Sequence, residues 1–225
     1  MDTLIIEKKN EVYITVDCDP NIQREISEFF TFYVPGYKFM PAFRNRMWDG
    51  KIRLYSQKTK EIYFGLFPYI RAFAEERGYQ IVSGEDVEIN NKVDKEIVKK
   101  FSNSLGQKFE ARDYQIDAIY HSLKFNRALL LSPTASGKSF IIYSLIRYYS
   151  HLVKDAPNNR ILLIVPTTSL VEQMYSDFQS YGWNVKKYCH RLYSGYSNQT
   201  DKKVLISTWQ SLYKLPKTYF EQFGV

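Results

Sequence analysis

The chain of 225 residues has the composition of a folded globular protein, with 44% apolar residues, 24% charged residues and a net charge of +7. These values exclude disorder along the whole chain, and the length fits one large domain or two small ones. No apolar run approaches the ~20 residues of a membrane-spanning helix, and the short, charged start is unlike a signal peptide.

Cysteine and histidine are scarce in the sequence. The two cysteines, Cys18 and Cys189, do not suggest a disulfide framework, and such a low number is typical of the reducing cytoplasm. The three histidines add no zinc-ligand spacing, because Cys189 and His190 are adjacent. We therefore expect a cytoplasmic protein without a membrane partner.

The charge is unevenly distributed along the chain. Residues 1–34 carry three bases and seven acids, whereas residues 35–60 carry seven bases and one acid. Residues 109–225 carry fourteen bases and eight acids, so two separated regions are basic. Such regions are typical of proteins that bind a polyanion, although a solvated basic surface gives the same totals. Charge alone therefore raises nucleic acid as a partner without deciding it.

The first 90 residues predict a small α+β domain. Apolar and polar residues alternate in its first strand, and Asp19 followed by Pro20 has the pattern of a helix start. Gly78 is expected to close a later helix. In chain order the expected elements are a strand over residues 11–18, a helix from Pro20 to the turn at Pro35-Gly36, a helix over residues 67–77 and a strand over residues 80–82.

A basic and aromatic segment lies between those two helices. Asp49-Gly50 stands between Met47-Trp48 and an alternating run over residues 51–55, which predicts a hairpin with Lys51, Arg53 and Tyr55 on one face. Bases that neutralise phosphates are interleaved here with rings that can stack on nucleobases. The alternative is a scaffold in which Trp48 is core and the charges are solvated. The residues predicted to bind nucleic acid in this segment are Arg44, Arg46, Lys51 and Arg53.

The second part of the chain has a different pattern. Residues 91–108 are polar and basic and are predicted to form a helical connector. From residue 109 to residue 225, short apolar strands alternate with helices, which is typical of βαβ units and a mainly parallel sheet. The fold class is therefore α/β. The expected strands are residues 128–131, 161–165, 185–188 and 204–207, and the expected helices are residues 113–124, 139–149 and 168–181.

The strongest motif is a loop of small residues between a predicted strand and a predicted helix. Residues 129–139 read Leu-Leu-Leu-Ser-Pro-Thr-Ala-Ser-Gly-Lys-Ser. Small residues let consecutive backbone N–H groups surround a phosphate, and the following helix N-terminus adds partial positive charge. The motif departs from the simple P-loop pattern at Ser132, where glycine is usual. The alternative is a chance Gly-Lys-Ser in a surface loop.

The loop predicts a site for ATP and Mg²⁺. Gly137 permits close backbone approach, Lys138 can reach the β- and γ-phosphates, and the Ser139 hydroxyl can ligate Mg²⁺. Upstream, Gln115 can hydrogen-bond both edge groups of adenine, while Arg112 or Phe109 can stack on the base. A capped helix start explains this upstream segment equally well. Lys138 and Ser139 are the predicted catalytic residues, and the predicted nucleotide-binding residues are Arg112, Gln115, Pro133, Thr134, Ala135, Ser136, Gly137, Lys138 and Ser139.

Hydroxyl-rich segments follow two of the predicted strands. Both lie at the carboxyl ends of strands in a parallel sheet, where open α/β sheets bind ligands. Their hydroxyls and helix N–H groups suit a phosphate backbone, although ordinary helix caps have the same composition. The residues predicted to contact nucleic acid here are Pro166, Thr167, Thr168, Gln173, Thr208, Trp209 and Gln210.

In this order and spacing, the segments resemble the first motor domain of superfamily-two DNA helicases. Residues 112–115 are similar to that family's adenine-reading Q motif, residues 132–139 to motif I, and residues 165–170 to motif Ia. Residues 207–212 are similar to a later DNA-contacting motif. The N-terminal part, including Trp-Asp-Gly-Lys-Ile-Arg-Leu at residues 48–54, resembles helicases of T-even-like phages.

This resemblance implies a fold and an activity. The expected fold is a small basic α+β DNA-binding domain over residues 1–90, a connector, and a partial RecA-like P-loop domain over residues 109–225. The expected activity is ATP-driven remodelling of branched DNA in recombination, repair and replication restart. Its substrates would be junctions of single- and double-stranded DNA and RNA–DNA hybrids, in the host cytoplasm if the protein belongs to a phage.

The resemblance also implies two features that are not found in these 225 residues. One is an Asp-Glu pair that ends an apolar strand, and the other is a second motor domain. We therefore expect activity to need a C-terminal motor half, and the chain alone to hydrolyse ATP very slowly. Two other classes stay open, an ATP-independent nucleic-acid-binding or annealing module and a small nucleotide kinase, although the Gln115 segment argues against the kinase. The acids after Lys138 are Asp155, Glu172, Asp177, Asp201 and Glu221.

Overall fold

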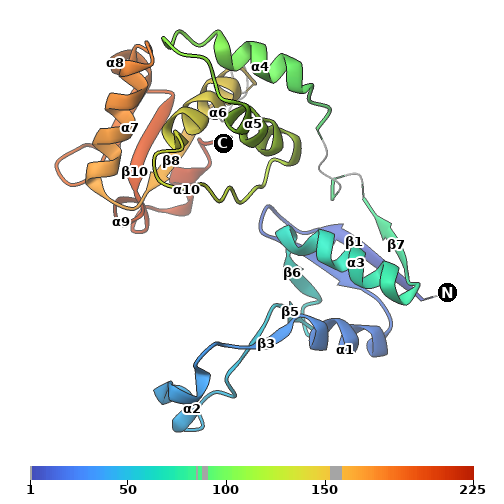
Figure 1. Ribbon diagram of the computed structural model, residues 1–225. Helices are drawn as coiled ribbons and strands as arrows, with labels where there is room; N and C mark the ends of the chain where they lie inside the picture. The colour runs from blue at the N-terminus through green and yellow to red at the C-terminus, as the bar shows by residue number, and fades with distance from the viewer. Residues whose placement is uncertain (1, 85, 88–90, 153–158) are drawn as a thin grey trace. The chain divides into compact units, whose positions relative to one another are not determined.

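The computed structural model describes residues 2–84, 86–87, 91–152 and 159–225 (Figure 1). The chain divides into two compact units, residues 1–90 and residues 91–225. We call them unit 1 and unit 2 and describe each by itself. Within the described residues, no helix is both long enough and apolar enough to cross a bilayer.

Unit 1 is built on a five-stranded sheet in the order β5–β6–β2–β1–β7. The β1–β7 pair is parallel, and the other three pairs are antiparallel. A separate two-stranded ribbon pairs β3 with β4. The elements are β1 (Thr3–Lys8), β2 (Tyr13–Asp17), α1 (Pro20–Phe29), β3 (Thr31–Tyr33), the 3₁₀ helix η1 (Tyr37–Phe39), α2 (Pro41–Arg44), β4 (Lys51–Arg53), β5 (Tyr55–Ser56), β6 (Glu61–Tyr63), the 3₁₀ helix η2 (Phe64–Leu66), α3 (Phe67–Arg77) and β7 (Gln80–Ser83).

The core of unit 1 lies between one face of this sheet and helices α1 and α3. The predicted helix start is confirmed, because the Asp19 carboxylate accepts a hydrogen bond from the Asn21 N–H (2.8 Å) and Pro20 opens α1. The predicted end of α3 is also confirmed, since Gly78 follows it with a φ of +71°. The core consists of apolar side chains from both layers, including Leu4, Ile6, Ile14 and Val16 from the strands and Ile22, Ile26, Ile70 and Phe73 from the helices.

The hairpin predicted at Asp49-Gly50 pairs β4 with the wrong strand. β4 pairs with β3, not with Met47-Trp48, so residues 34–50 form a longer connection that carries η1 and α2. The turn itself is present, because Gly50 has a φ of +79° and the Asp49 carboxylate accepts the Lys51 N–H (3.1 Å). A turn motif fixes only local geometry, whereas the partner strand depends on the rest of the unit. We call residues 34–51 the tip, so that it includes Lys51 at the start of β4.

Unit 2 contains a three-stranded parallel sheet in the order β8–β10–β9. The predicted βαβ pattern and parallel sheet are therefore confirmed. Helix α4 falls within the predicted connector, yet Val98 and Leu105 belong to the core of unit 2. The elements are α4 (Lys95–Asn103), α5 (Asp113–Phe125), α6 (Lys138–Leu152), β8 (Ile161–Val165), α7 (Thr168–Ser180), α8 (Val185–Tyr188), β9 (Cys189–Leu192), β10 (Val204–Thr208), α9 (Trp209–Leu212) and α10 (Lys217–Phe220).

The central strand β10 is buried on both faces. Val204 and Ile206 pack into the main core of unit 2, which also holds buried side chains of α5, α6 and α7. Leu205 points to the other face, where it clusters with Leu192 and Leu212. A strand that is covered on both faces reads as a continuous apolar run, which is why the sequence predicted it correctly.

Two predicted strands of unit 2 are not strands. Residues 128–131 pair with no strand among the described residues, and Leu129 and Leu131 are 84% and 89% exposed. An apolar run becomes a strand only where a neighbour supplies the ladder of hydrogen bonds. Residues 185–188 form α8, because the Asn184 carboxamide accepts the Lys187 N–H (3.2 Å), and the strand begins at Cys189.

Candidate nucleotide and nucleic-acid sites

The loop that precedes α6 has the geometry of an anion cradle. Ala135 and Gly137 have φ values of +64° and +79°, which turns the loop sharply before the helix. Among the described residues, no hydrogen bond occupies the backbone N–H groups of Ala135, Gly137, Lys138 and Ser139. Free N–H groups at a helix N-terminus attract phosphate. The predicted phosphate-binding residues are thus together in one loop.

The ammonium group of Lys138 lies against the same loop. Its Nζ donates hydrogen bonds to the carbonyl oxygens of Pro133 (2.6 Å) and Ser132 (3.2 Å). The Ser132 and Ser136 hydroxyls are hydrogen-bonded to each other, so the unusual serine at position 132 closes the loop. Lys138 therefore carries its positive charge where a phosphate in the cradle would lie.

Gln115 is a buried side chain that holds the loop through a hydrogen bond. It is only 5% exposed, its Nε2 donates to the Ser136 carbonyl (3.1 Å), and its Oε1 accepts from the Arg112 N–H (2.9 Å). A Cβ atom at Gly137 would lie 2.3 Å from Gln115 Nε2, so glycine is required for this close approach. The Nε2 and Oε1 atoms of Gln115 each keep one further hydrogen-bonding position. Adenine recognition by Gln115 therefore stays a prediction.

Tyr114 is a site residue that the sequence reasoning missed. Its hydroxyl donates to the Ser136 carbonyl (3.0 Å) and lies 3.0 Å from Arg112 Nη1, which donates to it. Its position in the sequence, within the Arg112–Gln115 segment, was the feature that could have indicated it. Phe109, the other stacking candidate, instead packs edge-to-face on the Phe140 ring at 5.1 Å.

A cleft of about 680 Å³ lies between the Arg112 segment and the loop. Such a volume lies in the usual range for sites that bind small molecules. One side of the cleft is lined by Arg112, the residue before α5, and by Tyr114 in α5. The other side is lined by residues 129–136 of the loop. The cleft therefore brings the predicted base-side residue Arg112 and the predicted phosphate loop to one site.

We predict that Gln115→Ala destabilises unit 2 even without nucleotide. The substitution leaves the Arg112 N–H without this partner and the Ser136 carbonyl with only the Tyr114 hydroxyl, which costs about 1–3 kcal/mol. Urea unfolding of the nucleotide-free protein measures the loss, with exposed Gln179→Ala on α7 as the control. An unchanged free energy of unfolding would show that Gln115 serves only a ligand.

The second predicted set lies at the carboxyl edge of the parallel sheet. Thr208 pairs with Val165 in register, so residues 166–168 and residues 209–210 leave the sheet side by side. Trp209 is 55% exposed, and Pro166, Thr168, Gln173 and Gln210 are exposed as well. This edge therefore presents polar groups and one large ring to solvent.

Two hydroxyls of this set are already engaged. The Thr167 hydroxyl caps α7 by accepting the Leu170 N–H (3.3 Å), and Thr208 is 4% exposed with its hydroxyl hydrogen-bonded to Ser211. Contacts with a ligand at this edge would then come mainly from the exposed neighbours.

Glu172 connects α7 to the edge strand β9 and to the loop that follows it. Its carboxylate accepts hydrogen bonds from the Tyr193 hydroxyl (2.6 Å) and from Arg191 Nη1 (2.6 Å). The Tyr193 hydroxyl, together with Arg191, holds the pKa of Glu172 below its usual range. The loop after β9 is thereby fixed at the same carboxyl edge, which the sequence did not reveal.

The basic tip of unit 1 extends away from the five-stranded sheet (Figure 1). At its base, the Tyr37 ring stacks on Tyr33 at 4.7 Å and meets Phe43 edge-to-face at 4.8 Å. Lys51 Nζ lies 4.9 Å from the centroid of the Tyr33 ring. Aromatic packing and a cation–π contact thus hold the tip together in place of a large core.

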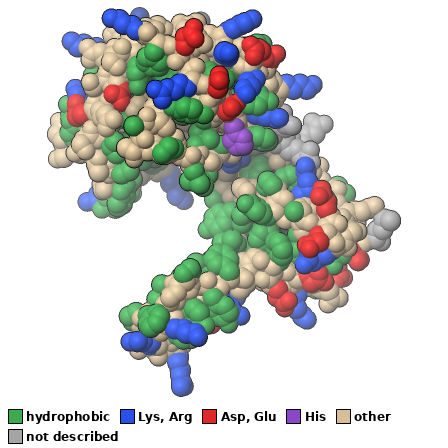
Figure 2. All heavy atoms as spheres, in the orientation of Figure 1, with side chains coloured by type: hydrophobic (Ala, Val, Ile, Leu, Met, Phe, Trp, Pro, Cys, Tyr) green, Lys and Arg blue, Asp and Glu red, His purple; other side chains and the backbone are tan. Residues whose placement is uncertain are grey.

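The four bases predicted to bind nucleic acid differ in their surroundings. Arg53 forms an ion pair with Asp49, and this hydrogen bond lowers the pKa of the Asp49 carboxyl. Lys51 lies over the Tyr33 ring, as above. Among the described residues, no carboxylate pairs with Arg44 or Arg46, and Figure 2 shows Lys and Arg side chains projecting from the end of unit 1 that carries α2. Arg44 and Arg46 are thus the most available charges.

Two family models match the chain. The family described as "Type III restriction enzyme, res subunit" matches residues 108–224, and the family described as "DNA helicase UvsW, N-terminal" matches residues 5–84. The solved structure described as "Crystal structure of the UvsW helicase from Bacteriophage T4" aligns with 100% of this chain and 81% of its own, at 31% identity and a TM-score of 0.84. The chain belongs to the UvsW helicase family.

Two further comparisons describe how much of a UvsW protein is present. A second solved structure, "The crystal structure of T4 UvsW", aligns at 32% identity and a TM-score of 0.85 over 100% of this chain and 46% of its own. The curated "ATP-dependent DNA helicase uvsW" of Enterobacteria phage T4 is 35% identical over 222 residues, or 95% of this chain. The chain spans 43% of that relative. The UvsW match confirms the α/β fold, with an N-terminal domain before a partial RecA-like domain.

Proposed function

We propose that this chain is the N-terminal part of an ATP-dependent DNA helicase or translocase that acts on branched DNA in recombination, repair and replication restart. The observation that carries the proposal is the cleft lined by Arg112 and by loop residues 129–136, with the Lys138 ammonium hydrogen-bonded to the Pro133 carbonyl of that loop. The name of the phage T4 relative, an ATP-dependent DNA helicase, supports it. We also propose the host cytoplasm as its location and RNA–DNA hybrids as further substrates.

The residues of the loop fit ATP with Mg²⁺. In the proposal, the Lys138 ammonium and the free N–H groups of Ala135, Gly137, Lys138 and Ser139 bind the phosphates, while the Ser139 hydroxyl contributes a ligand to Mg²⁺. Arg112, which lines the cleft, would lie on the base side, with Gln115 behind it and hydrogen-bonded to the Ser136 carbonyl. The metal ion supplies charge neutralisation to the transferred phosphoryl group when it is bound. Lys138 would exchange its bonds to the Ser132 and Pro133 carbonyls for bonds to phosphate oxygens.

Hydrolysis is proposed to depend on a C-terminal motor half. An acid that follows a strand at the nucleotide site holds the metal ion and helps to position the attacking water. Glu172 and Asp177 lie on α7, and no strand of the described residues ends in an acid at the carboxyl edge of the parallel sheet. We therefore expect very slow ATP hydrolysis by these 225 residues alone. A robust DNA-stimulated rate would contradict this proposal.

DNA is proposed to contact both units. In unit 1 the tip supplies Arg44, Arg46 and Lys51 for phosphates, with Arg53 acting through its ion pair with Asp49. In unit 2 the exposed ring of Trp209 and the polar groups around it suit a strand backbone with accessible bases. Two separate contact regions fit a branched substrate, which offers more than one arm.

We predict that reversing three charges at the tip weakens DNA binding strongly. In the variant Arg44→Glu, Arg46→Glu and Lys51→Glu, the loss of phosphate contacts should make the negative slope of log K against log salt shallower by about 2–3. Fluorescence anisotropy of a labelled DNA duplex over a salt series measures this. The same charge change at Lys8, Arg24 and Arg71, elsewhere in unit 1, is the control. Equal affinities of both variants at low salt would exclude the tip as a DNA contact.

A further inference from the structure

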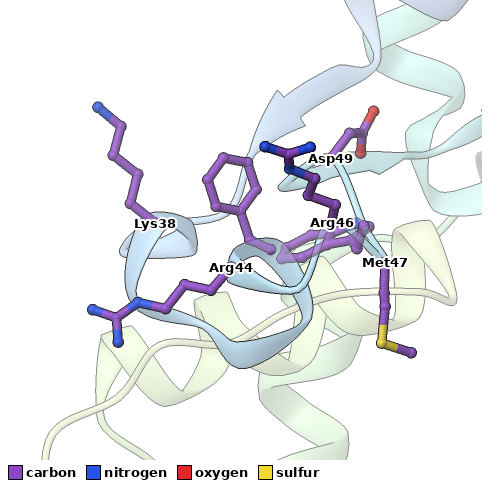
Figure 3. A pocket seen from close by; sticks show the side chains of 7 residues that line it. Lys38, Arg44, Arg46, Met47 and Asp49 are labelled. Atoms are coloured by element: carbon purple, nitrogen blue, oxygen red, sulfur yellow. The ribbon is translucent and has the colours of Figure 1, made fainter.

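The tip contains a pocket that phosphate neutralisation alone does not explain. It has a volume of about 610 Å³, and Figure 3 shows the side chains that line it. Phe43 and Trp48 are half-buried in it, and Met47 is 80% exposed at its rim. Lys38, Arg44 and Arg46 surround these apolar groups. A surface that only neutralised phosphates would need the cations but not the rings.

The Trp48 ring is held in place but has no ring partner. Its Nε1 donates to the Lys51 carbonyl (2.9 Å), so its polar atom is satisfied inside the tip. No other aromatic ring of the described chain pairs with it, whereas Tyr33, Tyr37 and Phe43 pack on one another. A fixed ring that stacks on no other ring is suited to stacking on a nucleobase.

Charge in the pocket favours an anion. Asp49 is the only carboxylate in the lining, and its oxygens are engaged by Arg53 and by the Lys51 N–H. No ion pair within the described residues occupies Lys38, Arg44 or Arg46. The net result is a small aromatic site whose rim carries three unpaired cations. This combination matches a nucleotide, which has an aromatic base joined to a phosphate.

The backbone at Arg46 is also unusual. Arg46 follows α2 with a φ of +57°, where its N–H donates to the Phe43 carbonyl (3.0 Å) and the Met47 N–H donates to the Ala42 carbonyl (2.9 Å). This is a Schellman arrangement, in which glycine is the usual residue because other side chains are strained. An arginine at such a position points to a role for its side chain that outweighs the strain.

We propose that the tip pocket binds one unpaired nucleotide of DNA, with its base stacked on Trp48 and its phosphate held by Arg44 and Arg46. The inference rests on the proposed function of unit 1 as a DNA-binding unit. A base inside a duplex has both faces covered by its neighbours, so only an unstacked base can reach the ring. The tip would then detect unpaired DNA, such as the single-stranded part of a branch point.

The test compares single-stranded and duplex DNA of one length in the full chain. Trp48→Leu should lower affinity for oligo(dT) by about 5- to 100-fold, the range for loss of one stacked base, and leave duplex affinity within about twofold. Trp48→Phe keeps a ring and should restore most of the single-strand affinity. Phe39→Leu is the matched control, because Phe39 lies on the same tip, is 77% exposed and does not line the pocket.

A second variant separates ligand binding from stability. Arg46→Gly relieves the left-handed backbone and should raise the melting temperature of unit 1 by roughly 2–6 °C. It should at the same time weaken binding to oligo(dT), because the guanidinium is lost. A variant with Trp48 as its only tryptophan (Trp183→Phe, Trp209→Phe) should show fluorescence quenching by oligo(dT) but not by duplex.

The outcomes distinguish this inference from the proposed function. If the charge-reversed tip loses DNA affinity but Trp48→Leu weakens single-stranded and duplex DNA equally, the pocket proposal is overturned and the tip is a phosphate contact only. Absence of quenching of the single tryptophan overturns it independently, even where Trp48→Leu fails to fold. If neither charge reversal nor Trp48→Leu changes DNA binding, both the pocket and the DNA contact of the tip are excluded, and the basic, aromatic tip would fit an acidic protein partner instead.

Discussion

Replacing Lys138 by alanine is expected to lower ATP affinity by about 10- to 100-fold, the cost of one lost charge-assisted hydrogen bond at a phosphate. Lys138 is the cation within the loop, and its Nζ already lies 2.6 Å from the Pro133 carbonyl at the cradle. Because the Lys138 side chain is exposed, the substitution should leave the fold intact. Titration with a fluorescent ATP analogue in the presence of Mg²⁺ measures the affinity.

The control for this variant is Lys186→Ala on α8, which removes the same charge outside the cleft. DNA affinity, measured by anisotropy at fixed salt, should change by less than about twofold in either variant, because one charge in this basic chain contributes little at a distance. If Lys138→Ala binds the analogue as well as the unchanged chain does, the loop is not the nucleotide site. The ATP-independent binding or annealing module would then be favoured.

Replacing Gly50 by alanine is expected to destabilise unit 1 by about 2–4 kcal/mol, the sum of a left-handed backbone and a steric overlap. Gly50 has a φ of +79°, and a Cβ at this position would lie 2.3 Å from Cδ2 of the Tyr37 ring. That ring is itself packed between Tyr33 and Phe43, so it has little room to move. Urea unfolding followed by circular dichroism measures the loss.

Gly36 offers a matched control in the same tip. It also has a positive φ, +74°, but a Cβ there would meet no atom within 4 Å. Gly36→Ala should therefore cost only the backbone part, about 1–2 kcal/mol. The difference between the two variants isolates the Tyr37 contact. Equal losses would mean that the ring does not pack on Gly50.

Local features of the fold were predictable from the sequence, because they depend on residues close in the chain. Asp19 and Pro20 start α1, Gly78 ends α3, and the apolar run of β8 has the predicted bounds, Ile161–Val165. The small-residue loop before α6 likewise forms a cradle with a positive φ at Gly137. Capping, turn and burial patterns act over a few residues, so they can be recognised without knowing which elements pack together.

Features that depend on distant partners were not predictable. The apolar run at residues 128–131 has no ladder partner among the described residues, and Asp49-Gly50 closes a ribbon with β3 instead of a two-residue hairpin. The structural contact of Gln115 was not predictable for the same reason. Its buried amide donates to the Ser136 carbonyl, 21 residues further along the chain, and no local sequence pattern predicts that contact.

By itself the sequence determined the α/β class, the phosphate loop and the family resemblance, since these are written in short motifs and their spacing. The tertiary structure alone decided which groups meet. It brought Tyr114 and Gln115 to the Ser136 carbonyl and placed Trp48 in one pocket with Arg44 and Arg46. The physical reason is that burial, hydrogen-bond partners and free charges are properties of a three-dimensional neighbourhood, and a chain position does not specify its neighbours.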